Sequence, residues 1–94
     1  MYLAIQKRGL LRMKSAVPHI KLVIEQPHEH AYPCWQLRIS IPGYPEPGIF
    51  VGNKGTARQW RSLNKITDFI RRLLPDIQHI EVKLHANHLA NNSP

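Results

Sequence analysis

The sequence predicts a small α+β domain: an antiparallel β-sheet of roughly four to five strands with one α-helix, over about residues 62–74, on one face. Apolar and polar residues alternate with the period of a β-strand in several segments that Pro- and Gly-rich turns separate. One later segment instead has the period of a helix. The chain has 94 residues, of which 43% are hydrophobic, and this suits a single domain. The predicted order is β-β-β-β-α-β.

The N-terminal residues 1–17 allow two interpretations. Residues 2–6 place Leu3 and Ile5 on one face, as a short extra strand would, whereas the basic run that follows suits a flexible arm. We therefore predict an arm or extra strand over residues 1–17 and a single domain over residues 18–86. A flexible polar tail is predicted over residues 87–94.

Two segments with strand periodicity follow. The first covers residues 20–25, and a loop with two prolines and two histidines over residues 26–33 separates it from the second. The second covers residues 35–41 and has the cleanest alternation in the chain, which predicts a half-buried antiparallel strand. Its apolar side carries Trp35, Leu37, Ile39 and Ile41, and its other side carries Gln36, Arg38 and Ser40.

A third strand and a hairpin precede the helix. Residues 49–51 form the strand, and residues 52–55 tolerate the positive φ of a tight turn, so residues 56–60 should form the return strand. Alternatively, the helix begins at Thr56, because Thr56-x-x-Gln59 fits a capping box. We favour the hairpin, because Ser62 is a good N-cap and the helical apolar period begins after it.

The helix has one apolar face and ends at a proline. Arg71 and Arg72 suit its last turn, where the helix dipole favours cations, and Pro75 stops it. A final strand follows, with Ile80 and Val82 on its apolar side. The apolar face of the helix carries Leu63, Ile66, Ile70 and Leu73.

Charge and cysteine content limit the possible functions. Thirteen Lys and Arg stand against six Asp and Glu, which gives a net charge of +7 and favours anionic partners such as nucleic acid. The single cysteine excludes an internal disulfide framework. With neither a signal-peptide pattern nor an apolar run long enough for a membrane span, we expect a cytoplasmic protein. An open sheet edge would be closed most simply by a homodimer.

Catalytic and metal-binding chemistry find little support in the sequence. His28, His30 and Cys34 are possible zinc ligands, but a structural site needs four ligands and no motif supplies the others. No phosphate loop, nucleophile elbow or paired carboxylates are present. We therefore expect no cofactor, no small-molecule substrate and no enzymatic activity.

Nucleic-acid binding is the function that the residues favour. Basic residues cluster around the hairpin and the first helical turn, and Trp60 stands among them, either to stack on a base or to anchor the hairpin. Arg38 lies on the open sheet face, where sheet-based readers place base-contacting groups. The alternative is a protein-interaction module without affinity for nucleic acid. The predicted nucleic-acid-binding residues are Arg38, Lys54, Arg58, Trp60, Arg61 and Lys65.

The hairpin and the helix also resemble segments of two groups of known proteins. Three strands followed by a helix, with Arg58 and Trp60 at the hairpin, resemble sheet-based DNA readers such as the arm-binding domains of phage-type integrases. The pattern Arg61-Ser62-Leu63-x-x-Ile66-x-x-Phe69-Ile70-Arg71 is similar to small uncharacterised proteins of plasmids and integrated mobile elements. The resemblance covers less than half of the chain. It implies an accessory protein of a mobile element, and no functional residue is transferred from it.

Overall fold

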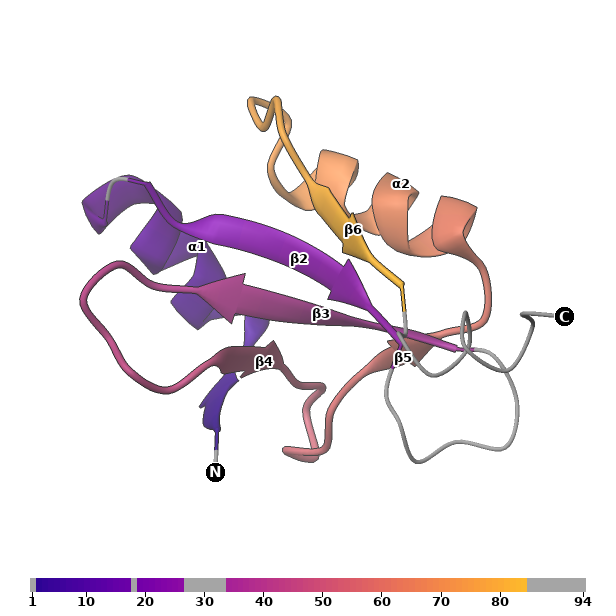
Figure 1. Ribbon diagram of the computed structural model, residues 1–94, viewed down its shortest axis with the longest axis horizontal. Helices are drawn as coiled ribbons and strands as arrows, with labels where there is room; N and C mark the ends of the chain where they lie inside the picture. Colours follow the sequence, from indigo (N-terminus) through magenta and orange to yellow (C-terminus); the bar gives the residue numbers. More distant parts are fainter. Residues whose placement is uncertain (1, 18, 27–33, 85–94) are drawn as a thin grey trace, which may run out of the picture.

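The computed structural model describes residues 2–17, 19–26 and 34–84. Residues 27–33 of the predicted loop, with His28 and His30, and the predicted tail at 87–94 lie outside these residues. The fold is α+β, as the sequence predicts (Figure 1). Its elements are β1 (Leu3–Ile5), α1 (Lys7–Ala16), β2 (Lys21–Glu25), β3 (Trp35–Ser40), β4 (Gly48–Phe50), β5 (Gln59–Trp60), α2 (Leu63–Leu73) and β6 (Glu81–Lys83).

The sheet is mixed, and the prediction of a purely antiparallel sheet is wrong. The strands follow the order β1-β4-β3-β2-β6, and β5 pairs with one end of β3. β3 is antiparallel to β2, β4 and β5, whereas β1 is parallel to β4 and β6 is parallel to β2. The reason is that α1 leads from β1 to β2 and α2 leads from β5 to β6. A helical crossover returns the chain in its original direction, which permits parallel pairs that hairpins cannot form.

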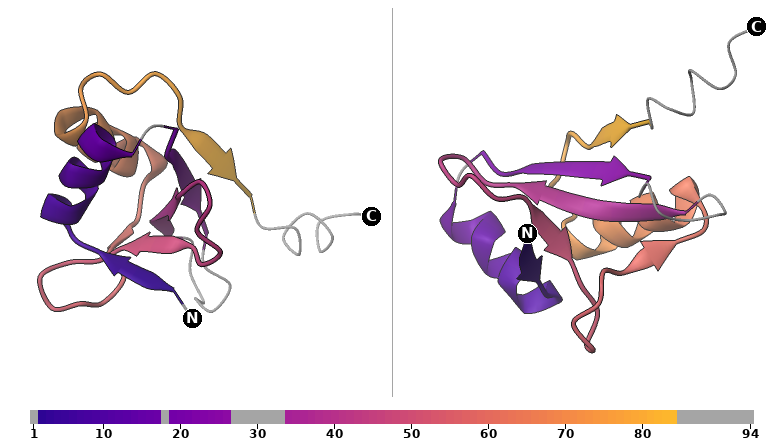
Figure 2. Two further views of the ribbon diagram at one scale, coloured as in Figure 1. Left: turned by 90° about the vertical axis from the view of Figure 1, so that its left-hand side faces the viewer. Right: turned by 60° about the horizontal axis from the view of Figure 1, so that its bottom comes forward.

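Both helices lie on the same face of the sheet and cover one hydrophobic core. Figure 2 shows α1 and α2 on one side, and no helix of the described chain covers the other face of the sheet. Leu10 of α1 and Ile66 and Ile70 of α2 are buried in the same cluster as the inward residues of the strands. The strands contribute Ile5, Leu22, Ile24, Leu37, Ile39, Phe50 and Trp60 to this cluster.

The helix α1 is absent from the sequence-based prediction, and it follows a short strand, β1, at Leu3–Ile5. Ile5 and Leu10 are both buried in the core, so this segment belongs to the packed domain rather than to an arm. Only Leu10 is buried within α1, its N-cap Gln6 makes no side-chain hydrogen bond, and Gly9 lies in its interior. The absent cap bond and the glycine weaken the local helical signal, so the burial of Leu10 against the sheet must stabilise the helix.

The helix α2 and the hairpin before it agree with the sequence-based prediction. Ser62 is the N-cap, and its Oγ accepts a hydrogen bond from the backbone N–H of Lys65 at 3.2 Å. The turn is closed by a hydrogen bond from the Gly52 N–H to the Thr56 carbonyl at 3.0 Å, and Gly55 has a φ of +82°. The helix therefore begins after Ser62 and not at Thr56. The return strand β5 is shorter than predicted.

Candidate nucleic-acid interface

Trp60 joins β5 to α2 through an aromatic cluster. Its side chain is only 8% exposed, and its ring centroid lies 5.2 Å from that of Phe69 on α2 and 6.2 Å from that of Phe50 on β4. Of the two roles predicted for Trp60, this geometry fits the anchor of the hairpin. The buried ring presents no face on which a base could stack.

Arg58 lies against the outer side of this cluster. Its guanidinium carbon is 4.8 Å from the ring centroid of Trp60 and 4.7 Å from that of Phe69. An Arg that stacks on aromatic faces keeps its charge and its hydrogen-bonding donors while losing side-chain freedom. The residue remains exposed, so an anion can reach this partly ordered cation at a reduced entropic cost.

Further cations continue along the same side of α2. Lys65 precedes Phe69 by one helical turn, and Arg72 follows it by three residues, so the three side chains form one stripe on the helix. Because Arg58 contacts Phe69, it belongs to the same stripe. Arg61 is exposed just before the helix N-cap. The structure thus places Arg58 and Lys65 on the side of α2 that carries Phe69, while Arg61 lies exposed in the segment that leads into the helix.

Arg38 and Lys54 do not join this group. Lys54 is exposed in the turn between β4 and β5. Arg38 lies in β3 with its side chain on the sheet face opposite the helices, where its Nε is 2.9 Å from Oε1 of Glu25. Both atoms are shielded from solvent. The Nε of Arg38 is thus paired with a carboxylate on the open sheet face.

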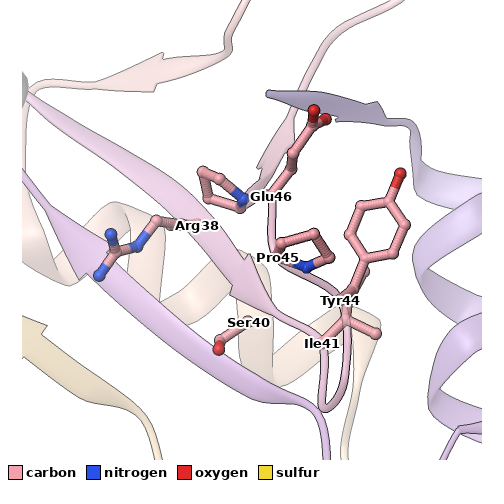
Figure 3. Close-up of a pocket in the computed structure, with 7 residues that line it drawn as sticks. Arg38, Ser40, Ile41, Tyr44, Pro45 and Glu46 are labelled. Carbon is pink, nitrogen blue, oxygen red and sulfur yellow. The ribbon is translucent and has the colours of Figure 1, made fainter. Parts of the chain in front are cut away.

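The open face of the sheet has a hollow beside Arg38 (Figure 3). It measures about 260 Å³ and lies between β3 and the loop over residues 41–47. In Figure 3 the guanidinium of Arg38 points away from Tyr44 and Glu46, which line the other side. Glu46 is acidic, and among the described residues that line the hollow Arg38 is the only cation. This arrangement is poorly suited to an anionic ligand.

The sequence-based site does not include α1, although the basic run is visible in the sequence. Four cations of α1 are exposed, and this helix contains no acidic residue. An interpretation of the run as an arm or strand gives no reason to place it on the same sheet face as α2. The four exposed cations of α1 are Lys7, Arg8, Arg12 and Lys14.

The cations of both helices therefore lie on the elements that cover one face of the sheet (Figure 2). Residues 7–16 and 58–73 together carry nine of the thirteen Lys and Arg but only one acid, Asp68. We call this surface the basic helix layer. It consists of Lys7, Arg8, Arg12, Lys14, Arg58, Arg61, Lys65, Arg71 and Arg72, all of them exposed.

The opposite sheet face is close to electrically balanced. Its strands carry three cations against two acids, and one pair of these, Arg38 and Glu25, is joined directly. The five charged residues are Lys21, Glu25, Arg38, Glu81 and Lys83. The excess positive charge of the chain is thus concentrated on the helix side, which a net charge alone does not reveal.

Other chemistry receives no support from the described part of the chain. Cys34 is buried, and desolvation raises the pKa of its thiol, which is the opposite of what an activated nucleophile needs. Among the described residues, no group of three or more His, Cys, Asp or Glu is placed to hold a metal ion. Within the same ranges, no helix is both long and apolar enough to cross a membrane.

Comparison with known proteins adds no functional information. No protein-family model, no curated protein and no solved structure matches the chain.

Proposed function

We propose that this protein is a non-enzymatic nucleic-acid-binding protein that contacts phosphates through the basic helix layer. The observation that carries the proposal is the one-sided distribution of charge: nine exposed cations and one acid lie on the helices and the segment that leads into α2. Such a surface neutralises phosphates and releases their condensed counterions, which is the main source of sequence-independent affinity for nucleic acid.

The chemistry of the layer favours a duplex over a single strand. Binding to single strands gains much of its strength from bases that stack on exposed aromatic rings. Among the described residues, the exposed tyrosines, Tyr2 and Tyr44, lie outside the helices, while Trp60 is buried. Phosphate contacts position a duplex without reading its sequence, so we expect binding with little sequence preference.

The proposal is tested by fluorescence anisotropy with a labelled mixed-sequence DNA duplex and a labelled single strand, over a series of salt concentrations. The affinity for duplex should fall steeply with salt, with a log–log slope of about −0.9 for each phosphate contacted. Arg12→Ala in α1 and Lys65→Ala in α2 should each weaken binding and reduce the magnitude of this slope by about 1.

Lys21→Ala is the matched control, because it also removes one exposed cation but does so from β2 on the sheet face. We expect this variant to bind as the unmodified protein does. Absence of salt-sensitive binding would contradict the proposal, as would an equal loss for Lys21→Ala and Arg12→Ala. Binding that persists unchanged at high salt would instead favour an apolar protein partner.

A further inference from the structure

The strand β6 forms one edge of the sheet in the part of the chain that the structure describes. Within the described residues it pairs only with β2, so the backbone groups on its outer side have no sheet partner there. All three of its residues are exposed, with Val82 at 44%, and Leu84 directly after it is exposed at 57%. Such an edge is a template for pairing with another strand.

The residues of β6 are complementary to themselves. If β6 pairs antiparallel with β6 of a second copy about a two-fold axis beside Val82, the two Val82 side chains face each other. Glu81 of each copy then faces Lys83 of the other copy, which places opposite charges across both remaining pairs. Outside these pairs, Ile80 faces Leu84, so the apolar side of the strand continues across the junction.

Neighbouring registers lack this complementarity. An axis beside Glu81 places the two glutamates opposite each other, and an axis beside Lys83 does the same with the two lysines, which is destabilising. A shift by one residue sets Val82 opposite a charged residue. The sequence of β6 therefore selects one register. A charged edge usually prevents pairing, but here each charge finds its opposite in the second copy.

The charges of the neighbouring strands extend the pattern. Lys83 lies in register with Glu25 of β2, and Glu25 forms the ion pair with Arg38. Glu81 of a second copy would lie on the outer side of Lys83. Charges would then alternate in sign from β3 across β2 and β6 to the second copy, and each pair would support its neighbours.

We propose that β6 is the surface through which two copies of this chain form a two-fold symmetric dimer with one continuous sheet. A two-fold axis perpendicular to the sheet keeps the helices of both copies on the same side. A short strand pair buries less than the roughly 1,200 Å² of a standard stable interface, so we expect the dimer to dissociate upon dilution. The proposal does not depend on nucleic-acid binding.

The test is sedimentation velocity on the full chain over a range of concentrations, which should show a monomer–dimer equilibrium. Lys83→Glu and Glu81→Lys should each weaken dimerisation by about fivefold or more, since each replaces two attractive cross-strand pairs by two repulsive ones. The double variant Glu81→Lys/Lys83→Glu should restore the dimer, because it exchanges the two charges. Lys21→Glu, with the same change of net charge as Lys83→Glu, should dimerise normally.

A mixture of the two single variants makes the test independent of effects within one chain. The Glu81→Lys variant carries two lysines on β6 and the Lys83→Glu variant carries two glutamates, so opposite charges face each other only in the mixed dimer. The mixture should therefore form heterodimers although neither variant dimerises well alone. Circular dichroism would establish that each variant is folded.

A chain that stays monomeric at all concentrations overturns the proposal. A dimer that is equally stable in the Glu81→Lys and Lys83→Glu variants also overturns the proposal, and it would indicate pairing through the opposite edge of the sheet, β1.

Discussion

Single residues show how the structure separates packing from the proposed binding surface on the helix side. Trp60 and Phe69 are held in the aromatic cluster, and Arg58 uses the outer faces of their rings as a support. A buried ring is therefore what positions an exposed cation. Arg38, which the sequence places among the binding residues, is instead held by Glu25 on the opposite face.

The role of Trp60 can be tested by two substitutions. Trp60→Ala should lower the free energy of unfolding by about 3–5 kcal/mol, because it leaves a cavity between β5 and α2. Trp60→Phe should cost less and preserve the affinity for duplex, since the ring packs and does not stack. Urea denaturation and anisotropy measure the two effects. A folded Trp60→Phe variant that no longer binds would contradict this account and indicate that the indole contacts the ligand.

Among the elements, α1 is the one that links the fold to the proposed function. It covers one end of the sheet through Leu10 while its four cations face solvent. Gly9 in its interior makes it a poor helix by itself, and a Cβ at this position would lie 3.6 Å from Cγ2 of Ile5, an ordinary contact distance. The glycine is therefore not required by a close approach.

Gly9→Ala should stabilise the protein, by about 0.5–1 kcal/mol, because alanine favours the helical backbone that α1 already has. Gly43 provides the contrast: its φ of +80° suits glycine, so Gly43→Ala should destabilise the protein although its Cβ would meet no atom. Thermal denaturation compares the two variants. If Gly9→Ala lowers the stability, the segment does not have the helical conformation described here.

For the molecule as a whole, the charge distribution lowers the stability of the folded state. Nine cations on one side repel one another, and Arg8 and Arg12 lie one turn apart on α1 without an acid between them. A surface that binds phosphate strongly is for this reason expected to be weakened by its own charge when no ligand is present.

Salt should therefore stabilise the free protein. Raising ionic strength from about 0.01 M to about 0.15 M shortens the Debye length from about 30 Å to about 8 Å and screens this repulsion. We expect the melting temperature to rise by about 2–5 °C, which corresponds to under about 1 kcal/mol. Arg8→Glu should reduce this dependence, because it introduces an attraction to Arg12 and places an acid near the helix N-terminus. Scanning calorimetry of both proteins is the measurement, and a melting temperature that falls with salt would contradict it.

Features that depend on local pattern could be predicted from the sequence. The strands β2 and β3, the turn at residues 52–55, and the cap and apolar face of α2 each follow from residues that are close in the chain, and all are present in the structure. The buried–exposed alternation holds in β3, whereas in β2 Val23 is buried together with Leu22 and Ile24. The basic character of the segment around α2 is also evident from the sequence, since composition needs no knowledge of the fold.

Features that depend on residues far apart in the chain could be established only from the tertiary structure. The helix α1 forms although its local signal is weak, because Leu10 is buried against strands that lie later in the sequence. The parallel pairs follow from the crossovers of the two helices, which strand periodicity does not encode. The same packing places α1 and its cations on the sheet face that α2 also covers, and it pairs Arg38 with Glu25. The location of the net charge is thus a property of the fold, because only the fold decides which charges become neighbours.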